Sequence, residues 1–323
     1  MPSLKEIKSR IASVNSTRKI TSAMKMVASS KLHHAQQMIE NMLPYENMLE
    51  HILKTFLASE VDAHTVFSEI RPVKKAALLV YSSNSSLCGG FNANVIKMMN
   101  SVVAEYSSTI GKDNIIVYPI GRKVAEQVNK RSIRNGGDFV ELADKPNMAQ
   151  CIDIAVELED MFAKGEIDRV EMIYHHFRSA GSQVLQRKTL FPVDLESVLG
   201  ADNDRDLSQK TVTAEMMQYL KENAKPVEPK KPENVKPLND NFIVEPDMET
   251  ILSALIPKYA NLMIYTALLD SQASEHAARM VAMQTATDNA DELLRGLRLQ
   301  YNKSRQQAIT NELLDIVGGT VNN

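Results

Sequence analysis

The chain has 323 residues, 44% of them hydrophobic and 24% charged, which is enough for one ordinary globular core and a further element. Its formal net charge of -3 argues against a general nucleic-acid-binding protein, and its two cysteines argue against a disulfide framework. No secretory leader pattern opens the chain, and no apolar run reaches the length needed to cross a bilayer. We therefore expect membrane contact only through another protein.

Residues 1–57 predict a long N-terminal helix. No glycine occurs between Leu4 and Leu57, and Pro44 is expected to kink the helix or to end its regular first part. The apolar residues that recur at helical spacing are Leu4, Ile7, Ile11, Val14, Ile20, Met24, Val27, Leu32, Ala35 and Ile39.

The start of this helix is strongly basic. Seven lysines and arginines lie between Lys5 and Lys31, against the single acid Glu6. A mitochondrial transit peptide has this composition, but a cleaved leader would not continue unbroken into a long helix. A solvated face is the usual explanation of a charge run, whereas a run of one sign also suits an acidic partner surface. Both of these interpretations stay open.

Residues 72–193 predict a central α/β domain of Rossmann-like type. Short apolar strands alternate with amphipathic helices, and the last two strands flank the turn Ser179–Ser182 as a hairpin. The predicted strands are 75–81, 115–120, 169–177 and 183–191, and the predicted helices run from the Gly89-Gly90 turn to about residue 106, after Gly121, and over 148–163.

The Gly89-Gly90 turn has two interpretations. A glycine turn at a helix N-terminus can cradle a phosphate. Neither a G-x-G-x-x-G pattern nor an acidic residue in register accompanies it, so a packing turn is favoured.

Residues 194–245 predict a segment without a core of its own. It contains an acidic patch at Asp202, Asp204 and Asp206 and a possible short helix at 215–221. Prolines alternate with charges over Lys225–Lys236, which is typical of an extended, solvated chain, and we expect that stretch to be mobile.

Residues 247–323 predict one very long C-terminal helix. A set of mostly apolar residues along it alternates steps of four and three, which is the heptad spacing of a coiled-coil seam. About sixty residues span roughly 90 Å at the helical rise, so such a helix needs a partner. We expect the N-terminal helix to pair with it in antiparallel orientation. The seam residues are Leu255, Tyr259, Leu262, Thr266, Leu269, Ala273, His276, Met280, Met283, Thr287, Ala290, Leu294, Leu297 and Tyr301.

Motifs at both ends carry a family resemblance. LKEIKSRI at Leu4–Ile11 and KITSAMKMVA at Lys19–Ala28 resemble the N-terminal signature of the ATP synthase gamma subunit, the central shaft of the F1 motor. ASEHAARMVAM at Ala273–Met283 and the residues from Tyr301 to Glu312 resemble the C-terminal signature of the same family. The 194–245 segment departs from the usual family length and lacks the cysteine pair by which chloroplast relatives are regulated, so thiol control is not implied.

The resemblance implies an α/β fold class with a long antiparallel two-helix coiled coil. It implies a rotor shaft that turns inside an alpha3beta3 hexamer and couples ion flow to ATP synthesis or hydrolysis at the beta subunits. Such a shaft is a non-catalytic subunit. The expected partners are the alpha, beta and epsilon subunits and the c-ring, with no cofactor, metal or nucleic acid. The motif close to Met1 favours a bacterium, and hence the cytoplasmic face of its inner membrane.

The resemblance also assigns roles to individual residues. From spacing alone, Gln306 and Thr310 at i and i+4 are best explained as ordinary exposed helix residues, so their role as a polar catch rests on the resemblance. The expected contacts to the beta subunits are Met24, Lys25, Arg279, Gln306 and Thr310, and the expected residues of a hydrophobic bearing are Ile309, Leu313, Leu314, Ile316 and Val317.

Two other classes of function are open. A static coiled-coil scaffold or tether has no reason to change the ATPase rate of its partner. An enzyme built on the central domain predicts nucleotide or substrate binding by residues 72–193 alone. The chain has no G-x-x-x-x-G-K-[ST] loop, no H-E-x-x-H and no cysteine-pair metal spacing, and the side chains of adjacent histidines diverge. ATP chemistry is therefore expected on other chains.

Overall fold

The computed structural model describes residues 3–57, 66–193, 205, 245 and 248–321. The chain forms two compact units. The two-helix unit comprises Met1–Ala28 and Arg279–Asn323, and the sheet unit comprises Ser29–Ala278. The acidic residues Asp202, Asp204 and Asp206, the possible helix at 215–221 and the proline-rich stretch at 225–236 lie outside the described residues.

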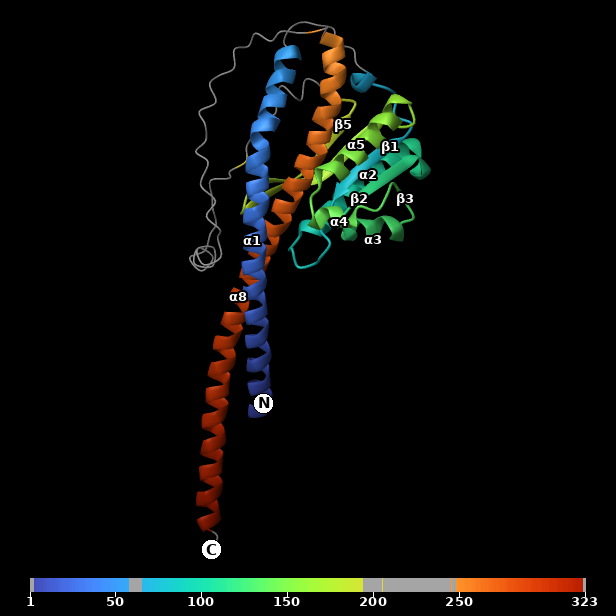
Figure 1. The fold of residues 1–323 in the computed structure, drawn as a ribbon. Coiled ribbons are helices and arrows are strands. Elements are labelled where there is room, and N and C mark those ends of the chain that lie inside the picture. The colour runs from blue at the N-terminus through green and yellow to red at the C-terminus, as the bar shows by residue number, and fades with distance from the viewer. Residues whose placement is uncertain (1–2, 58–65, 194–204, 206–244, 246–247, 322–323) are drawn as a thin grey trace. The chain divides into compact units, whose positions relative to one another are not determined.

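Helices and strands alternate through the middle of the chain, between two very long helices (Figure 1). The long helices are α1 (Leu4–Leu57) and α8 (Met248–Val321). Among the described residues, the other helices are η1 (Val66–Ser68), α2 (Phe91–Ile110), η2 (Lys112–Asn114), α3 (Arg122–Lys130), α4 (Val140–Asp144) and α5 (Met148–Ala163). The strands are β1 (Ala76–Tyr81), β2 (Ile115–Ile120), β3 (Arg134–Asn135), β4 (Arg169–Ser179) and β5 (Ser182–Phe191).

The sheet has five strands in the order β3-β2-β1-β4-β5. β1 pairs in parallel with β2 and β4, β2 pairs in parallel with β3, and β5 returns antiparallel to β4 as the predicted hairpin. β1 and β2 are buried along their whole length, which explains why both read as unbroken apolar runs. The predicted α/β class is confirmed.

The two faces of the sheet bury separate cores. Alternate residues of β1 point to opposite faces, as strand geometry requires. Leu78 and Val80 pack with α2 and α3, whereas Leu79 and Tyr81 pack with α5, α8 and the second half of α1. The long helices are therefore part of the core of the sheet unit.

The seam predicted along α8 is confirmed, because each of its fourteen predicted residues is buried or half-buried. The seam predicted along α1 is partly wrong. Ile20 and Val27 are exposed, and their places in the heptad register are taken by Arg18, Thr21 and Lys25. α1 also continues to Leu57, so the helix does not end at the proline at position 44.

One stretch of α8, within Thr250–Leu314, is long and apolar enough to cross a membrane by length and composition. The prediction that no apolar run reaches that length is therefore wrong. In the structure 56% of this stretch is buried, as is typical of a helix in a protein core.

Candidate functional site

Polar contacts join the two helices of the two-helix unit across their seam. The hydroxyls of Thr21 and Thr287 lie 2.8 Å apart, and the Arg18 guanidinium lies 3.6 Å from the Asp291 carboxylate. Moving toward the start of α1 therefore moves toward the end of α8, which confirms the antiparallel pairing. Because both helices rise equally per residue, Leu4 lies at the level of about residue 304, and α8 continues beyond it (Figure 1).

Three of the predicted contact residues lie at or beside this seam. Met24 and Lys25 are half-buried on α1, and no carboxylate among the described residues forms an ion pair with Lys25. Arg279 on α8 is buried and engaged in contacts within the chain. Part of the positive charge of this region is therefore engaged within the helix pair. Of Lys25 and Arg279, Lys25 is the more accessible to a partner protein.

The outer faces of the two helices carry large apolar residues that the sequence interpretation missed. Apolar side chains that lie exposed together on one protein typically mark a surface that a partner protein covers. The heptad pattern of α1 runs from Ile7 through Ile11 and Val14 to Arg18. Following this pattern along the sequence would have placed Ile20 and Val27 outside the seam. Within residues 4–28 and 279–304, the exposed large apolar residues are Ile20, Met26 and Val27 on α1 and Val281, Leu293 and Leu299 on α8.

The remaining predicted contact residues lie on α8 past the start of α1. Gln306 and Thr310 are exposed, and the Thr310 hydroxyl donates a hydrogen bond to the Gln306 carbonyl at 2.9 Å. Ile309, Leu313 and Leu314 of the predicted bearing are exposed as well. The side chains of the other two bearing residues, Ile316 and Val317, lie outside the described residues.

The Gly89-Gly90 turn is closed by side chains of the chain itself. The backbone N–H of Ser83 donates to Asn92 Oδ1 at 3.1 Å, and Asn92 Nδ2 donates to Cys88 Sγ at 3.1 Å. Gly89 has φ of 59°, a conformation that glycine adopts readily. These contacts support the packing turn over the phosphate cradle.

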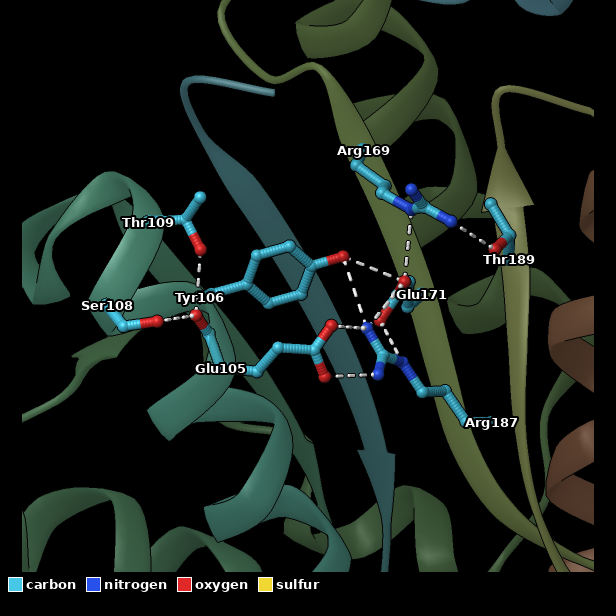
Figure 2. A network of polar contacts seen from close by, with 8 residues as sticks. All are labelled: Glu105, Tyr106, Ser108, Thr109, Arg169, Glu171, Arg187 and Thr189. Atoms are coloured by element: carbon cyan, nitrogen blue, oxygen red, sulfur yellow. Dashed lines mark hydrogen bonds and ion pairs between the residues drawn. The ribbon is translucent and has the colours of Figure 1, made fainter. Parts of the chain in front are cut away.

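A charged network attaches α2 to the hairpin (Figure 2). Its centre is the carboxylate of Glu171 on β4, which is 1% exposed. This carboxylate accepts hydrogen bonds from Tyr106 Oη at 2.8 Å and Arg187 Nε at 2.7 Å, and Arg169 Nε lies 3.0 Å away. Arg187 also bonds to Glu105 at 2.7 Å. Elements distant in sequence are therefore fastened together by one buried acid.

The acidic and basic groups of this network neutralise one another. The hydrogen bond from Arg187 is the main influence that lowers the pKa of Glu105. Burial, together with the hydrogen bond to Glu171, raises the pKa of Tyr106 to about 12. The network borders a pocket of about 500 Å³ that Val73, Thr109 and Ile110 also line. Since these charged groups already bind one another, their arrangement supports a structural role.

Comparisons with known proteins agree with the two-helix and sheet architecture. A family model described as ATP synthase matches residues 3–321. The ATP synthase gamma chain of Phocaeicola vulgatus is 49% identical over 321 residues, which cover 99% of this chain and 100% of that relative. The ATP synthase gamma chain of Parabacteroides distasonis is 42% identical over 319 residues, which cover 99% and 98%.

Solved structures show the same fold. A chain in the OSCP/F1/c-ring structure of Euglena gracilis mitochondrial ATP synthase, rotational state 3, has a TM-score of 0.57 at 18% identity, covering 98% of this chain and 93% of that chain. A chain in the rotor structure of the same synthase has a TM-score of 0.56 at 16% identity, covering 95% and 98%. Because the family model spans almost the whole chain and close relatives match it from end to end, this chain belongs to the ATP synthase gamma chain family.

Proposed function

We propose that the chain is the central rotor shaft of an F-type ATP synthase, coupling ion flow through the membrane sector to ATP synthesis or hydrolysis. Membership of the gamma chain family makes it a subunit of a membrane-associated complex. The observation that supports the shaft role best is the antiparallel pair of long helices, whose seam is buried and whose outer face exposes apolar side chains.

The mechanism follows from symmetry. Three catalytic units around a threefold axis are equivalent until a single pair of helices, which has no threefold symmetry, contacts each of them differently. The catalytic sites are then out of step, and turning the shaft exchanges their states in order. Binding free energy at the sites and rotation of the shaft are therefore linked in both directions.

The partners follow from this role. The exposed apolar faces of α1 and α8 suit the inner wall of an alpha3beta3 hexamer, and the sheet unit suits the epsilon subunit and the c-ring. We assign the beta-subunit contacts to Met24, Lys25, Arg279, Gln306 and Thr310, and the bearing to residues 309, 313, 314, 316 and 317. The complex would lie on the cytoplasmic face of a bacterial inner membrane. The proposed division of the chain is 1–57, 72–193, 194–245 and 247–323.

Cysteine cross-linking in the assembled synthase tests rotation directly. Leu299→Cys places a thiol on the exposed face of α8, and a second cysteine is introduced in the facing wall of the beta subunit. The native Cys88 and Cys151 are both buried, so they interfere little. Oxidation should abolish ATP turnover, and reduction should restore it. Turnover that continues with the shaft cross-linked to the wall would favour the static scaffold.

A matched control uses a cross-link within the shaft. Thr21→Cys with Thr287→Cys places two thiols where two hydroxyls now lie 2.8 Å apart, which is compatible with a disulfide. Both helices turn together, so this disulfide should leave turnover largely unchanged. Loss of turnover in both cross-linked forms would indicate that oxidation itself damages the complex.

A further inference from the structure

One arginine of the network in Figure 2 leaves most of its donors unused. A guanidinium has five N–H donors. The Arg169 guanidinium makes one hydrogen bond to the described residues, from Nη2 to Thr189 Oγ1 at 3.3 Å. Its Nε is buried and lies 3.0 Å from the Glu171 carboxylate, but makes no hydrogen bond. Nη1 has no partner in the described part of the chain, so Arg169 can bind a further acceptor.

The Thr189 hydroxyl beside this guanidinium is a second unused donor. Its oxygen accepts the hydrogen bond from Arg169, so its own proton points to another acceptor. None of the described residues supplies that acceptor. Arg169 and Thr189 lie on the neighbouring strands β4 and β5, with their side chains together at the edge of the network (Figure 2). One oxygen-bearing anion would satisfy both donors.

The other charges of the network are already paired. Arg187 donates to both oxygens of Glu171 and to both oxygens of Glu105, and Tyr106 donates to Glu171 as well. Arg187 offsets one of the two carboxylate charges and Arg169 offsets the other. The Glu105 side chain is 58% exposed, so solvent screens its repulsion of an anion. Because the group as a whole is neutral, we expect an anion to bind with millimolar affinity.

The two donors line the pocket of about 500 Å³ that borders the network. A pocket of this volume accommodates a small organic molecule. Val73 and Ile110 form an apolar part of its wall. Arginine binds carboxylate and phosphate oxygens through paired hydrogen bonds, so this wall suits an organic body that carries an oxyanion. A cation would be repelled by Arg169, and an uncharged molecule would forgo its charge.

We propose that this pocket is a binding site for small organic anions. Arg169 and Thr189 bind the carboxylate or phosphate group of the ligand, and Val73 and Ile110 contact its organic body. The ligand touches α2, β4 and β5 together, so its binding stabilises their attachment to one another. The proposal rests on the pocket alone and is independent of the shaft role.

Isothermal titration of the full chain with four probes of similar shape tests the site. Phenyl phosphate and benzoate carry an oxyanion on a phenyl ring, benzyl alcohol is uncharged, and benzylamine is a cation at neutral pH. One or both anions should bind with millimolar affinity, and the uncharged and cationic probes should not bind. Binding of phenyl phosphate alone assigns the site to phosphate groups, and binding of benzoate alone assigns it to carboxylates.

Two variants locate the binding. Arg169→Gln removes the charge, and Thr189→Val removes the hydroxyl at nearly constant shape. Anion binding should weaken roughly tenfold in Arg169→Gln and about threefold in Thr189→Val, since charge-assisted hydrogen bonds are stronger than neutral ones. Arg131→Gln removes an exposed arginine elsewhere in the sheet unit and is the matched control, which should bind as wild type does.

Several results would overturn the proposal. Absence of binding by both anions at tens of millimolar is one, and equal binding of benzyl alcohol, which would show an apolar pocket only, is another. Unchanged anion binding in Arg169→Gln would place the anion elsewhere on the chain. Should Arg169→Gln fail to fold, Thr189→Val decides the question, because it alters no charge, and unchanged affinity in that variant would contradict the site.

Discussion

The hydroxyl of Thr21 on α1 and the hydroxyl of Thr287 on α8 share one hydrogen bond, 2.8 Å long, within the seam of the two-helix unit. Each hydroxyl also lies within bonding distance of a carbonyl of its own helix, Arg18 O at 3.1 Å and Met283 O at 2.8 Å. Since each threonine has a single hydroxyl proton, at most one of them donates across the seam while the other donates to its own helix.

This pairing predicts non-additive mutational effects. Thr21→Val or Thr287→Val alone should lower the free energy of unfolding by about 1 to 3 kcal/mol, because one seam hydroxyl loses its partner. The double valine variant should lose clearly less than the sum of the two. Denaturant unfolding of the full chain measures all three, with Thr285→Val on the exposed face as control. Strictly additive losses would contradict a shared hydrogen bond.

The proposed beta-subunit contacts at Lys25 and Arg279 predict a loss of coupling, which for Lys25 should come with little loss of stability. Exposed charge pairs contribute only about 0.2 to 1 kcal/mol each, and Lys25 is not paired within the described part of the chain. Lys25→Gln combined with Arg279→Gln should reduce the number of ions pumped per ATP hydrolysed. Because Arg279 is buried, Lys25→Gln should be the milder of the two single variants for folding. Normal coupling in the double variant would contradict the contact with the beta subunits and would favour the interpretation of the basic residues as a solvated face.

The proposed catch predicts a severalfold drop in turnover. Gln306 and Thr310 are exposed on α8 beyond the start of α1, so alanine at both positions should leave the isolated chain as helical as before. Loss of hydrogen bonds to a partner costs about 1 to 3 kcal/mol for each group left unpaired. Steady-state ATP turnover of the reconstituted complex should therefore fall. Gln307→Ala, which removes a neighbouring exposed amide, is the control. Normal turnover in the double variant would contradict the catch and would mean that α8 contacts the beta subunits at this level by shape alone.

The network around Glu171 predicts strong destabilisation when its main donor is removed. Arg187→Met leaves a buried carboxylate without two of its hydrogen bonds, and the expected loss is about 3 to 5 kcal/mol. Glu171→Gln combined with Arg187→Met should recover part of that loss. Lys164→Met, which breaks an exposed pair with Asp160, should cost less than about 1 kcal/mol. Thermal unfolding of the full chain ranks the three variants.

The buried His175 predicts a specific pH dependence. Its ring stacks on Phe91 at 4.3 Å, and burial lowers its pKa to about 4. The unfolded chain therefore binds the proton first, near pH 6.5, so this contribution to stability is complete above that pH and is lost as the pH falls toward 4. His175→Phe should make the free energy of unfolding less dependent on pH in this window. The exposed His34→Phe controls for the loss of a histidine. Equal slopes in wild type and His175→Phe would contradict the prediction.

Much of the fold was predictable from the sequence because its signals are local or strictly periodic. The predicted strand over 115–120 and the predicted helix over 148–163 agree with β2 and α5 residue for residue. The heptads of α8 correctly predicted its buried face, because small and apolar residues gathered on one side of a helix favour burial of that side. The terminal motifs were long enough to indicate the family.

The partners of the charged side chains depended on tertiary structure. The heptads of α1 already place Arg18 on the seam and Ile20 outside it, but only the position of α8 brings Asp291 to the Arg18 guanidinium. Glu171 acquires its donors from α2 and β5, and Arg205 donates to Glu46 and Asp270, which lie 159 and 65 residues away in the chain. Sequence spacing carries no signal for such pairs, because burial and charge neutralisation across distant segments are decided by how the elements pack.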